Sequence, residues 1–498
     1  MPPVHSTPAS CFPRLAVRTA GELSKLYKFS ATQSENRLHL PSRLWTKFDK
    51  FAAPTLVERP LTSPMDRLTS CGTIISWGQG TMKKILYAGL AFGALAAASP
   101  AGADTICEWM DFAQAIQTAA APPPTAPRTP DHDHAQTQVA LAMFEAVNAI
   151  DRRYESYVGL AVGHPKASQD AAAVTAAFKV LLAHFPGQKT ALEDSYSIAM
   201  EQVMDAAARD SGKAIGEAAA EAALKFGNID PTVALTPYLP AAKPGVWVPT
   251  QLPVFDPTSV AFKPWIMPHA AAVRPAAPPA MTSEVWVRDY DEVKRLGART
   301  SKERTAYQTL MARYRITPSM TPSLRLAADA PGRSAVQNAR MFALLQMISD
   351  DAVMAIADAK LHYNFWRPIT AIRNGDKDGN DATQPDRSWE PLIATPNHPE
   401  YPCGHCIFSG STAEFMTAEV GAKPPGGVRV ASRSIANSAI QALPSWDDWA
   451  REVSFSRTLG GVHYRFSNEA GDKMGREIAR MALAKLMRPL PKAAKKRG

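Results

Sequence analysis

Two cations lie seven residues apart in the most helical part of the chain. Lys360 and Arg367 have this spacing, and Pro368 follows directly. On a helix with 3.6 residues per turn, both side chains would project from one face. Two cations on one face attract an anion, although a pair of solvated surface charges is the simpler interpretation of this spacing alone. The pair indicates an anion site only if other segments supply further ligands.

A second segment places a glycine and a histidine at the start of a predicted helix. The residues from His398 to His405 read His-Pro-Glu-Tyr-Pro-Cys-Gly-His, and a helical pattern follows them. The free N–H groups at a helix start, together with the positive end of its dipole, favour an anion. Gly404 and His405 would lie at this binding site for an oxyanion.

A third segment contains Arg457 and His463, six residues apart. Gly460 and Gly461 lie between them and would let the backbone bend closely. His463 alone would be interpreted as a core histidine held by hydrogen bonds. Each of the three segments is a weak signal by itself.

The elements that position these segments are expected to be helices in an all-α fold. Apolar residues recur at three- and four-residue spacing, which is typical of amphipathic helices. The expected helices span 134–150, 171–183 and 211–226, with a renewed pattern near Ser283 and the strongest one from Ser334 to Trp366. Alternating hydrophobicity of the strand type is scarce.

A proline-rich stretch interrupts the helical pattern. Twelve prolines fall between Pro231 and Pro279, where neither helices nor central strands tolerate them easily. Its aromatic residues are Tyr238, Trp247, Phe255, Phe262 and Trp265. They suggest an irregular segment that wraps on the protein surface rather than a free linker. We therefore expect an N-terminal helical region at 104–230, a wrapping segment at 231–281 and a helical bundle with the site at 282–498.

An export signal is expected at residues 82–103. Two lysines follow Met82, an uncharged apolar run of 14 residues spans Ile85 to Ala98, and Ala-Gly-Ala ends the stretch. A membrane span needs roughly 20 apolar residues, so the run is typical of a signal peptide. Residues 1–81 would then be a misassigned start or a disordered extension. The protein is expected to be exported, periplasmic or secreted, without a transmembrane anchor.

The basic charge of the chain comes mostly from this leader. Residues 104–498 carry 43 Lys or Arg against 41 Asp or Glu. Charge therefore gives no reason to expect a nucleic-acid partner.

Three cysteines follow the leader, namely Cys107, Cys403 and Cys406. An exported protein meets an oxidising compartment, which makes a Cys403–Cys406 disulfide possible and would leave Cys107 unpaired. Three cysteines allow other pairings as well.

In their order along the chain, the three segments resemble the signature of the vanadium haloperoxidase and phosphatidic acid phosphatase type 2 (acid phosphatase) superfamily. They match the pattern Lys-x6-Arg-Pro, then Pro-x-Gly-His, then Ser-Arg-x5-His. The stretches Ala140 to Ile150 and Pro244 to Pro249 are similar to segments of bacterial haloperoxidase-type proteins. The resemblance implies the all-α helical bundle of that superfamily.

The resemblance also implies roles for the cations and the helix start. Lys360, Arg367 and Arg457 would neutralise the oxygens of vanadate or phosphate, the guanidinium groups through paired hydrogen bonds. Gly404 would donate its backbone N–H to an oxygen.

Three histidines receive roles in the same way. His463 would bind vanadium in a haloperoxidase or attack phosphorus in a phosphatase, and His405 would be the general acid or base. His398 stands where bromoperoxidases of the family carry histidine, which favours bromide or iodide as the halide. The alternative is that His398 only bonds nearby backbone before Pro399.

Cys403 departs from the family pattern, which has serine at this position. A thiol is a weaker donor to the oxyanion than a hydroxyl, a disulfide to Cys406 would donate nothing, and peroxide could oxidise a free thiol. Cys-Gly-His-Cys is also identical to the motif of protein disulfide isomerases, but that motif normally follows a strand of a thioredoxin-like unit. A structural clip is therefore favoured over redox catalysis.

The leading hypothesis is a vanadate-dependent haloperoxidase that oxidises halide with hydrogen peroxide. Lipid phosphatases of the superfamily span the membrane several times and its acid phosphatases are shorter, whereas the long helical N-terminal half here looks like a haloperoxidase-type protein. The alternative is a phosphatase that hydrolyses phosphomonoesters through a phosphohistidine at His463, without vanadate. A third interpretation is a vanadate- or phosphate-binding protein with low turnover.

Overall fold

The computed structural model describes residues 104–121, 131–233, 235, 238–251, 254, 257–435 and 438–491. The expectations for residues 1–81 and for the signal peptide at 82–103 lie outside these residues. Within them the α-helices are α2 (Thr105–Ala120), α3 (Asp131–Ile150), α4 (Gln169–His184), α5 (Lys189–Glu201), α6 (Ala206–Ala223), α7 (Glu284–Gly297), α8 (Ala306–Tyr314), α9 (Thr321–Ala328), α10 (Ala335–Tyr363), α11 (Pro368–Arg373), α12 (Gly404–Val420), α13 (Trp446–Leu459) and α14 (Arg465–Lys485). Short 3-10 helices are η1 (Pro186–Gln188), η2 (Pro257–Ala261), η3 (Ala270–Val273) and η4 (Gly375–Lys377).

Strands are short and few in the described part of the chain, so the expected all-α fold is confirmed. β1 (Pro318–Ser319), β2 (Val428–Ser432) and β3 (Gln441–Leu443) form one antiparallel sheet in the order β1-β2-β3. Pro318 pairs with Ser432, and Val428 pairs with Leu443. Among the described residues, no helix is both long and apolar enough to cross a membrane.

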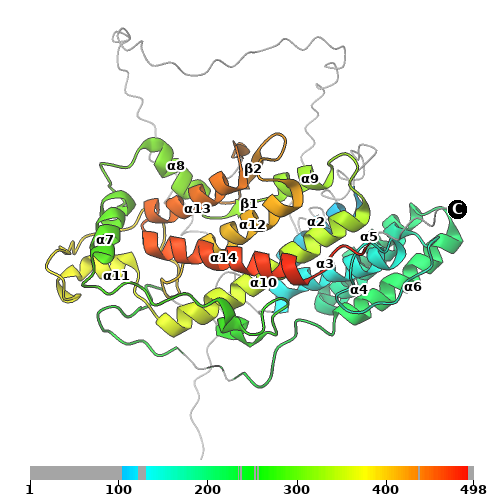
Figure 1. Cartoon of the computed structure of the whole chain (residues 1–498), viewed down its shortest axis with the longest axis horizontal. Helices are drawn as coiled ribbons and strands as arrows, with labels where there is room; N and C mark the ends of the chain where they lie inside the picture. The colour runs from blue at the N-terminus through cyan, green and yellow to red at the C-terminus, as the bar shows by residue number, and fades with distance from the viewer. Residues whose placement is uncertain are drawn as a thin grey trace, which may run out of the picture. The chain divides into compact units, whose positions relative to one another are not determined.

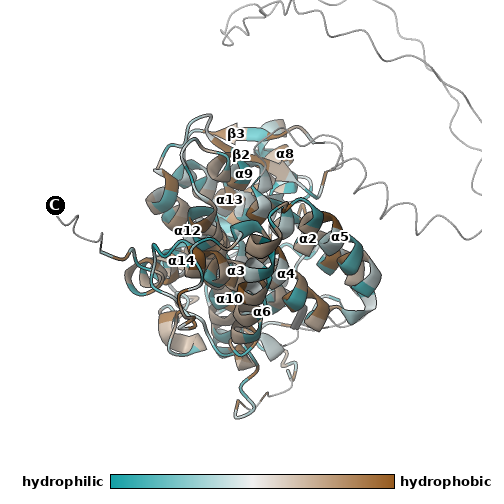
Figure 2. Cartoon of the chain, turned by 90° about the vertical axis from the view of Figure 1, so that its right-hand side faces the viewer, coloured by the Kyte–Doolittle hydropathy of each residue, from teal (hydrophilic) through white to brown (hydrophobic). Residues whose placement is uncertain are grey.

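The helices α3, α4, α6 and α10 pack together in one bundle (Figure 2). Small residues let α4 and α6 approach closely. A Cβ atom added at Gly212 or Gly216 would lie 2.5 Å from Ser168 O or 2.4 Å from Ala172 O. The alanine-rich periodicity of the sequence thus encodes tight helix packing.

Helix α10 runs through the centre of the molecule and carries the first candidate segment at its end (Figure 1). It packs on α3 toward the N-terminal bundle and on α12 toward the C-terminal one. Most of its residues are buried, which is why its sequence is apolar on nearly every face. A long buried helix of this kind is a rigid support for a site.

The proline-rich segment packs on α10. The backbone N–H groups of Trp265, Ile266 and Met267 donate to the Asp351 carboxylate, and the Trp265 indole donates to Asp350. Burial raises the pKa of Asp351 to about 6 despite these donors. Trp247, Phe262 and Trp265 are buried. The segment is therefore a brace along the central helix.

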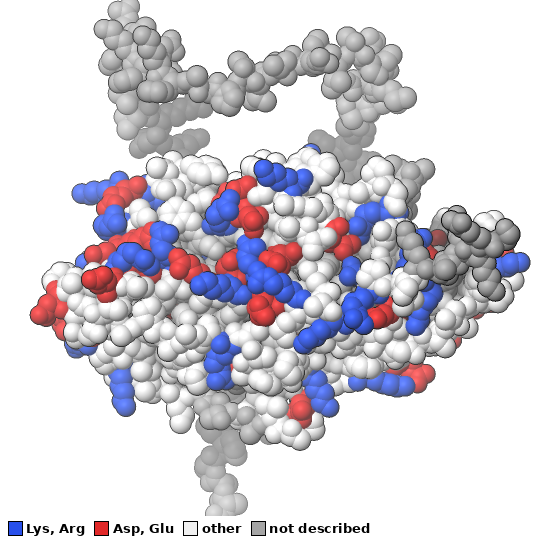
Figure 3. All heavy atoms as spheres, in the orientation of Figure 1, with Lys and Arg blue, Asp and Glu red and all other residues white. Residues whose placement is uncertain are grey.

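Helices α12 and α14 cross in close contact beside the second candidate segment. A Cβ atom at Gly475 would lie 2.0 Å from Ile407 O, and one at Gly471 would lie 2.4 Å from Cys403 O. On the outer surface, Arg476 and Arg480 of α14 form ion pairs with Glu414 of α12. Figure 3 shows blue and red side chains interspersed over this face (Figure 3).

Candidate active site

Lys360 lies in the last turn of α10 and holds the loop in front of α12. Its Nζ donates to three backbone carbonyl groups, those of Pro399 at 2.8 Å, Glu400 at 2.7 Å and Pro402 at 2.6 Å. Burial and the charge of Arg367 move its pKa well below the usual value for lysine. An ammonium has three N–H donors, so in this structure Lys360 positions the loop with all of them.

Arg367 does not share a helix with Lys360, so the expectation of one continuous helix through Trp366 is wrong. Helix α10 ends at Tyr363, and Asn364 caps it in the left-handed conformation with a φ of 44°. Arg367 precedes Pro368 and is extended, with φ −77° and ψ 156°, because a residue before proline disfavours helical backbone. The cap turns the chain and directs Arg367 toward the other two segments.

The proline-rich brace forms backbone hydrogen bonds with the turn that follows α10. Trp247 N–H donates to Asn364 O at 2.8 Å, and Trp366 N–H donates to Gly245 O at 3.1 Å. Val246 and Phe365 form an isolated antiparallel bridge between these bonds. The stretch from Pro244 to Pro249 therefore fixes the chain between the two cations.

The Arg367 guanidinium joins the second segment to the third. Its Nε donates to His398 O at 3.0 Å, and one Nη donates to Val462 O at 2.8 Å and to Nε2 of His463 at 3.1 Å. The side chain is fully buried, which lowers its pKa to about 10, while the nearby Glu400 opposes that shift. Arg367 remains a cation near neutral pH.

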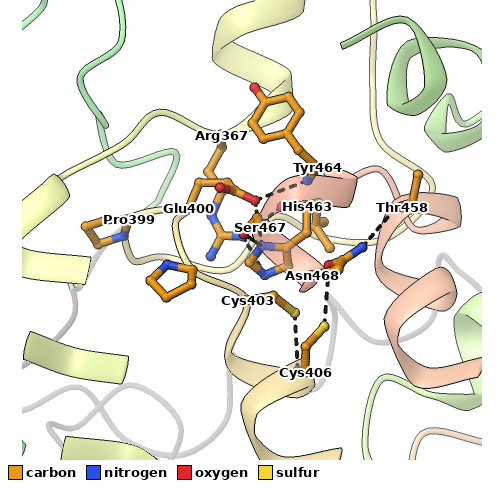
Figure 4. A network of polar contacts seen from close by, with 12 residues as sticks. Arg367, Pro399, Glu400, Cys403, Cys406, Thr458, His463, Tyr464, Ser467 and Asn468 are labelled. Atoms are coloured by element: carbon orange, nitrogen blue, oxygen red, sulfur yellow. Dashed lines mark hydrogen bonds and ion pairs between the residues drawn. The ribbon is translucent and has the colours of Figure 1, made fainter. Parts of the chain in front are cut away.

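Glu400 orients His463 from the opposite side (Figure 4). Its Oε1 lies 2.7 Å from Nδ1 of His463 and also accepts from Tyr464 N at 3.2 Å. A guanidinium can only donate, so Nε2 of His463 accepts from Arg367 and the proton of the neutral ring is on Nδ1. The ring therefore carries its lone pair on Nε2, the atom that a metal or a phosphorus centre would need, and in this structure Arg367 donates to it.

Burial shifts the pKa values of both Glu400 and His463. Burial raises the pKa of Glu400 to about 7, although Arg367 and Lys360 lower it. Burial and the neighbouring cations move the pKa of His463 well below its usual value. The sequence analysis assigned no role to Glu400. The available signal was an acidic residue beside two histidines and within a set of cations.

Arg457 lies at the end of α13 and has no carboxylate partner among the described residues. One Nη donates to Arg315 O at 3.4 Å, and the buried Nε has no hydrogen-bond partner there. Burial lowers the pKa of the Arg457 guanidinium, and the neighbouring Cys403 and Cys406 oppose that shift. A buried guanidinium without a counter-ion is costly unless an anion binds to it.

The start of α12 faces this cation. Gly404 is the first helical residue, and Cys403 is the N-cap, whose Sγ accepts from Cys406 N at 3.3 Å. The nearest atom that a Cβ at Gly404 would meet is Ile356 Cγ1 at 3.9 Å. The first N–H groups of a helix have no partner within it, so this partly exposed turn offers donors to an anion.

A C-terminal part of the chain, just under a third of its length, matches a known family in sequence. Residues 340–491 match the family model of the VCPO second helical-bundle domain, and they contain all three candidate segments. The chain belongs to the vanadium haloperoxidase-type superfamily.

Solved structures with this vanadium haloperoxidase fold match over most of the chain. The structure described as the first bacterial vanadium-dependent iodoperoxidase has a TM-score of 0.64 and 21% identity, and covers 80% of this chain and 99% of that one. A holo-type bacterial vanadium-dependent chloroperoxidase has a TM-score of 0.56 and 17% identity, and covers 75% of this chain and 96% of that one. No curated protein matches.

His405 lies on the first turn of α12 in this haloperoxidase-type bundle. Its Nε2 lies 2.9 Å from Ile316 O and donates to it. Burial, reinforced by Arg457, lowers its pKa to about 3. The imidazole is therefore neutral over most of the pH range, with Nδ1 as its proton-accepting atom.

His398 contacts both Arg367 and its own loop. Its Nδ1 lies 2.9 Å from Nη2 of Arg367 and 3.0 Å from Pro399 O. Burial and the charges of Lys360 and Arg367 move its pKa well below the usual value. The backbone contact that the sequence allowed is present, and the contact with Arg367 joins His398 to the haloperoxidase-type site.

The possible disulfide is not formed in this structure. Cys403, Cys406 and Cys107 are all free and buried. The Sγ of Cys403 accepts the helix N–H of Cys406, and the Cys406 thiol donates to Oδ1 of Asn468 at 3.4 Å. Each sulfur is thus engaged in a hydrogen bond that a disulfide would change.

Proposed function

We propose that this chain is a vanadate-dependent haloperoxidase that oxidises halide with hydrogen peroxide, with bromide or iodide favoured. The observation that carries the proposal is the buried Arg457 guanidinium at the end of α13, which lies near the start of α12 and has no carboxylate partner in the described chain. The matched structures include an iodoperoxidase and a chloroperoxidase. His398 stands where bromoperoxidases of the family carry histidine, which favours bromide or iodide over chloride.

The residues present fit a tetrahedral oxyanion such as vanadate. Arg367 and Arg457 would hold its oxygens, and the N–H of Gly404 would donate to another. His463 would supply Nε2 to the metal, because Glu400 keeps the proton on Nδ1. Vanadate, when bound, would act as the Lewis acid that activates peroxide.

The chain itself supplies orientation and proton transfer. Lys360 fixes the loop that carries Glu400 and so sets the direction of His463. The Nδ1 atom of His405 can accept a proton. An anion on Arg457 would offset the charge that depresses the pKa of His405, and would return that pKa toward the range useful for acid–base work.

Phosphomonoester hydrolysis is the alternative, and the His463–Glu400 pair favours it specifically. A histidine whose lone pair is fixed by a carboxylate is suited to in-line attack on phosphorus. His405 would protonate the leaving alcohol. Binding of vanadate or phosphate with low turnover is the third candidate, because Cys403 replaces the serine of the family pattern.

One pair of assays separates these functions. The purified chain is incubated with vanadate, hydrogen peroxide and bromide or iodide, and in parallel with a chromogenic phosphate ester without vanadate. Halide oxidation that requires vanadate supports the proposal. Phosphate release without halide oxidation would overturn it, and bound vanadate with neither activity would establish the binding function.

Matched variants sharpen the assays. His463→Ala should abolish halide oxidation, whereas the same change at the exposed His269 should not. Cys403→Ser restores the hydroxyl donor of the family pattern and should raise halide oxidation about tenfold, since a hydrogen bond to a charged group is worth about 1.5–3 kcal/mol. Unchanged or lower turnover in the serine variant would show that Cys403 does not limit the reaction.

We also propose that the protein is exported, on the basis of the signal-peptide pattern at 82–103. Asp104 follows that pattern and caps α2, where its side chain accepts from Ile106 N. N-terminal sequencing of the protein purified from its native host should return a mature chain that begins at Asp104. A mature chain that begins upstream of Met82 would contradict the proposal.

A further inference from the structure

Cys403 and Cys406 stand at the two ends of the first turn of α12, and both are free and buried. Cys403 Sγ accepts the backbone N–H of Cys406 at 3.3 Å, and the Cys406 thiol donates to Oδ1 of Asn468 (Figure 4). If Cys403 only replaced the serine of the family pattern, a second cysteine at position 406 would have no role. A second thiol on the same helical turn is what a dithiol reaction requires.

The surroundings of the two sulfurs differ in a way that suits such a reaction. Cys403 lies at a helix N-terminus beside the buried Arg457. Burial raises its thiol pKa, but Cys406 and Arg457 outweigh burial and lower that pKa below its usual value. A thiolate at such a position is the reactive form of cysteine. Burial and Cys403 itself hold the pKa of Cys406 well above the usual value, so Cys406 keeps its proton. One sulfur is thus a nucleophile, and the other is a protonated partner.

The turn that carries these sulfurs is held from two sides. The Cys406 thiol donates to Oδ1 of Asn468, whose Nδ2 donates to Ser454 O at 2.9 Å and to Thr458 Oγ1 at 3.0 Å. Gly471 packs so closely that an added Cβ would lie 2.4 Å from Cys403 O. Asn468 and Gly471 of α14 therefore keep both sulfurs at one end of the site. Beside them, Gly404 and His405 are partly exposed, which gives a small peroxide an approach.

We propose that Cys403 and Cys406 are a peroxide-reactive dithiol, a second centre in this chain that reduces hydroperoxides and forms an intramolecular disulfide. It requires neither vanadate nor halide. The dithiol reaction therefore goes beyond the haloperoxidase function, and it can be tested in the absence of vanadate and halide.

The chemistry balances in two steps. The Cys403 thiolate attacks one peroxide oxygen, so that an S–O bond forms, the O–O bond breaks, and the other oxygen leaves as hydroxide and takes a proton to become water. The sulfur of Cys406 then attacks the sulfur of Cys403. The S–S bond forms, the S–O bond breaks, and the hydroxyl group leaves with the proton of Cys406 as water. Two electrons pass from the sulfurs to the peroxide, and a dithiol reductant would return them.

The test uses the fully reduced 498-residue chain without vanadate or halide. One equivalent of hydrogen peroxide is added, free thiols are alkylated at intervals, and peptides are identified by mass spectrometry. We expect Cys403 and Cys406 to become linked at least about tenfold faster than Cys107 reacts, because thiolates outcompete buried thiols. Cys107 is the internal control, since burial raises its pKa to about 12.

Single variants separate the two roles. Cys406→Ser should stop at a sulfenic acid on Cys403 that a nucleophilic probe captures, and Cys403→Ser should lose the fast reaction. Cys107→Ser should behave as the wild type. A circular dichroism melt of each variant shows whether it is folded, and any unfolded variant is replaced by the corresponding alanine.

The proposal is overturned if Cys403, Cys406 and Cys107 oxidise at equal rates, or if no Cys403–Cys406 linkage forms in the folded wild type. Catalytic consumption of peroxide with dithiothreitol, lost in both Cys403→Ser and Cys406→Ser, would establish turnover. Failure of the halide assay has no bearing on these outcomes, because they contain no halide.

Discussion

Glu400 Oε1 lies 2.7 Å from Nδ1 of His463, and both side chains are buried. Sixty-three residues separate the two in the chain. The contact selects one tautomer of the imidazole and turns Nε2 toward Arg367. A carboxylate behind a ligating histidine raises the basicity of the ring and fixes its direction.

Glu400→Gln should therefore weaken vanadate binding about 10- to 100-fold, because the amide retains an acceptor but loses the charge. Equilibrium dialysis with vanadate measures the affinity. Glu390→Gln is the matched control, since Glu390 pairs with Arg299 in a partly exposed position. Equal affinity in the two variants would mean that the charge of Glu400 has no part in anion binding.

The Arg457→Met variant should be more stable than the wild type but should no longer bind an oxyanion. The variant removes a buried cation that lacks a carboxylate partner in the described chain, so we expect its free energy of unfolding to rise by about 1–3 kcal/mol. Phosphate should raise the melting temperature of the wild type and leave that of the variant unchanged. A less stable variant that still responds to phosphate would place the anion elsewhere.

Lys360→Met should destabilise the protein by about 3–5 kcal/mol, because it leaves three buried carbonyl groups without their donor. Urea unfolding measures the loss. Lys377→Met at an exposed position is the control and should change the midpoint little. A small loss at Lys360 would show that the loop keeps its shape without the ammonium.

His405 should make the protein sensitive to acid. Burial lowers its folded-state pKa from 6.5 to about 3, so its stabilising contribution is complete above pH 6.5 and is lost as the pH falls toward 3. At pH 5 the protonation of the unfolded chain should cost about 2 kcal/mol. Comparison of urea midpoints at pH 7 and pH 5 should show a smaller decrease for His405→Gln than for the wild type. His269→Gln, at an exposed position, should decrease as the wild type does.

The helical elements were predictable from the sequence because their periodicity is local. The segments expected at 134–150 and 171–183 lie within α3 and α4, and the one expected at 211–226 ends slightly earlier, at Ala223 in α6. The early end of α10 was not predictable from periodicity, because the apolar pattern continues past Asn364 while the cap and the proline end the helix. Local patterns give the elements and miss the turns between them.

The candidate site was predictable in composition but not in contacts. The three segments supplied Arg367, His463 and the start of α12, which lie together in the structure. The partners of Lys360 are carbonyl groups of a loop about 40 residues away, and no residue type reveals such a bond. Glu400 was hidden for the same reason, since only the fold brings it behind His463.

The brace between Gly245 and Trp366 also determines how the chain can be divided. Residues 340–491 contain every chemical group assigned to the oxyanion site, yet the hydrogen bonds that fix the turn before Arg367 come from Gly245 and Trp247. A fragment limited to the family-matched domain would keep the ligands and lose the external support for one of its two arginines. We therefore expect that a shortened chain keeps the geometry of this turn only if it retains the proline-rich segment.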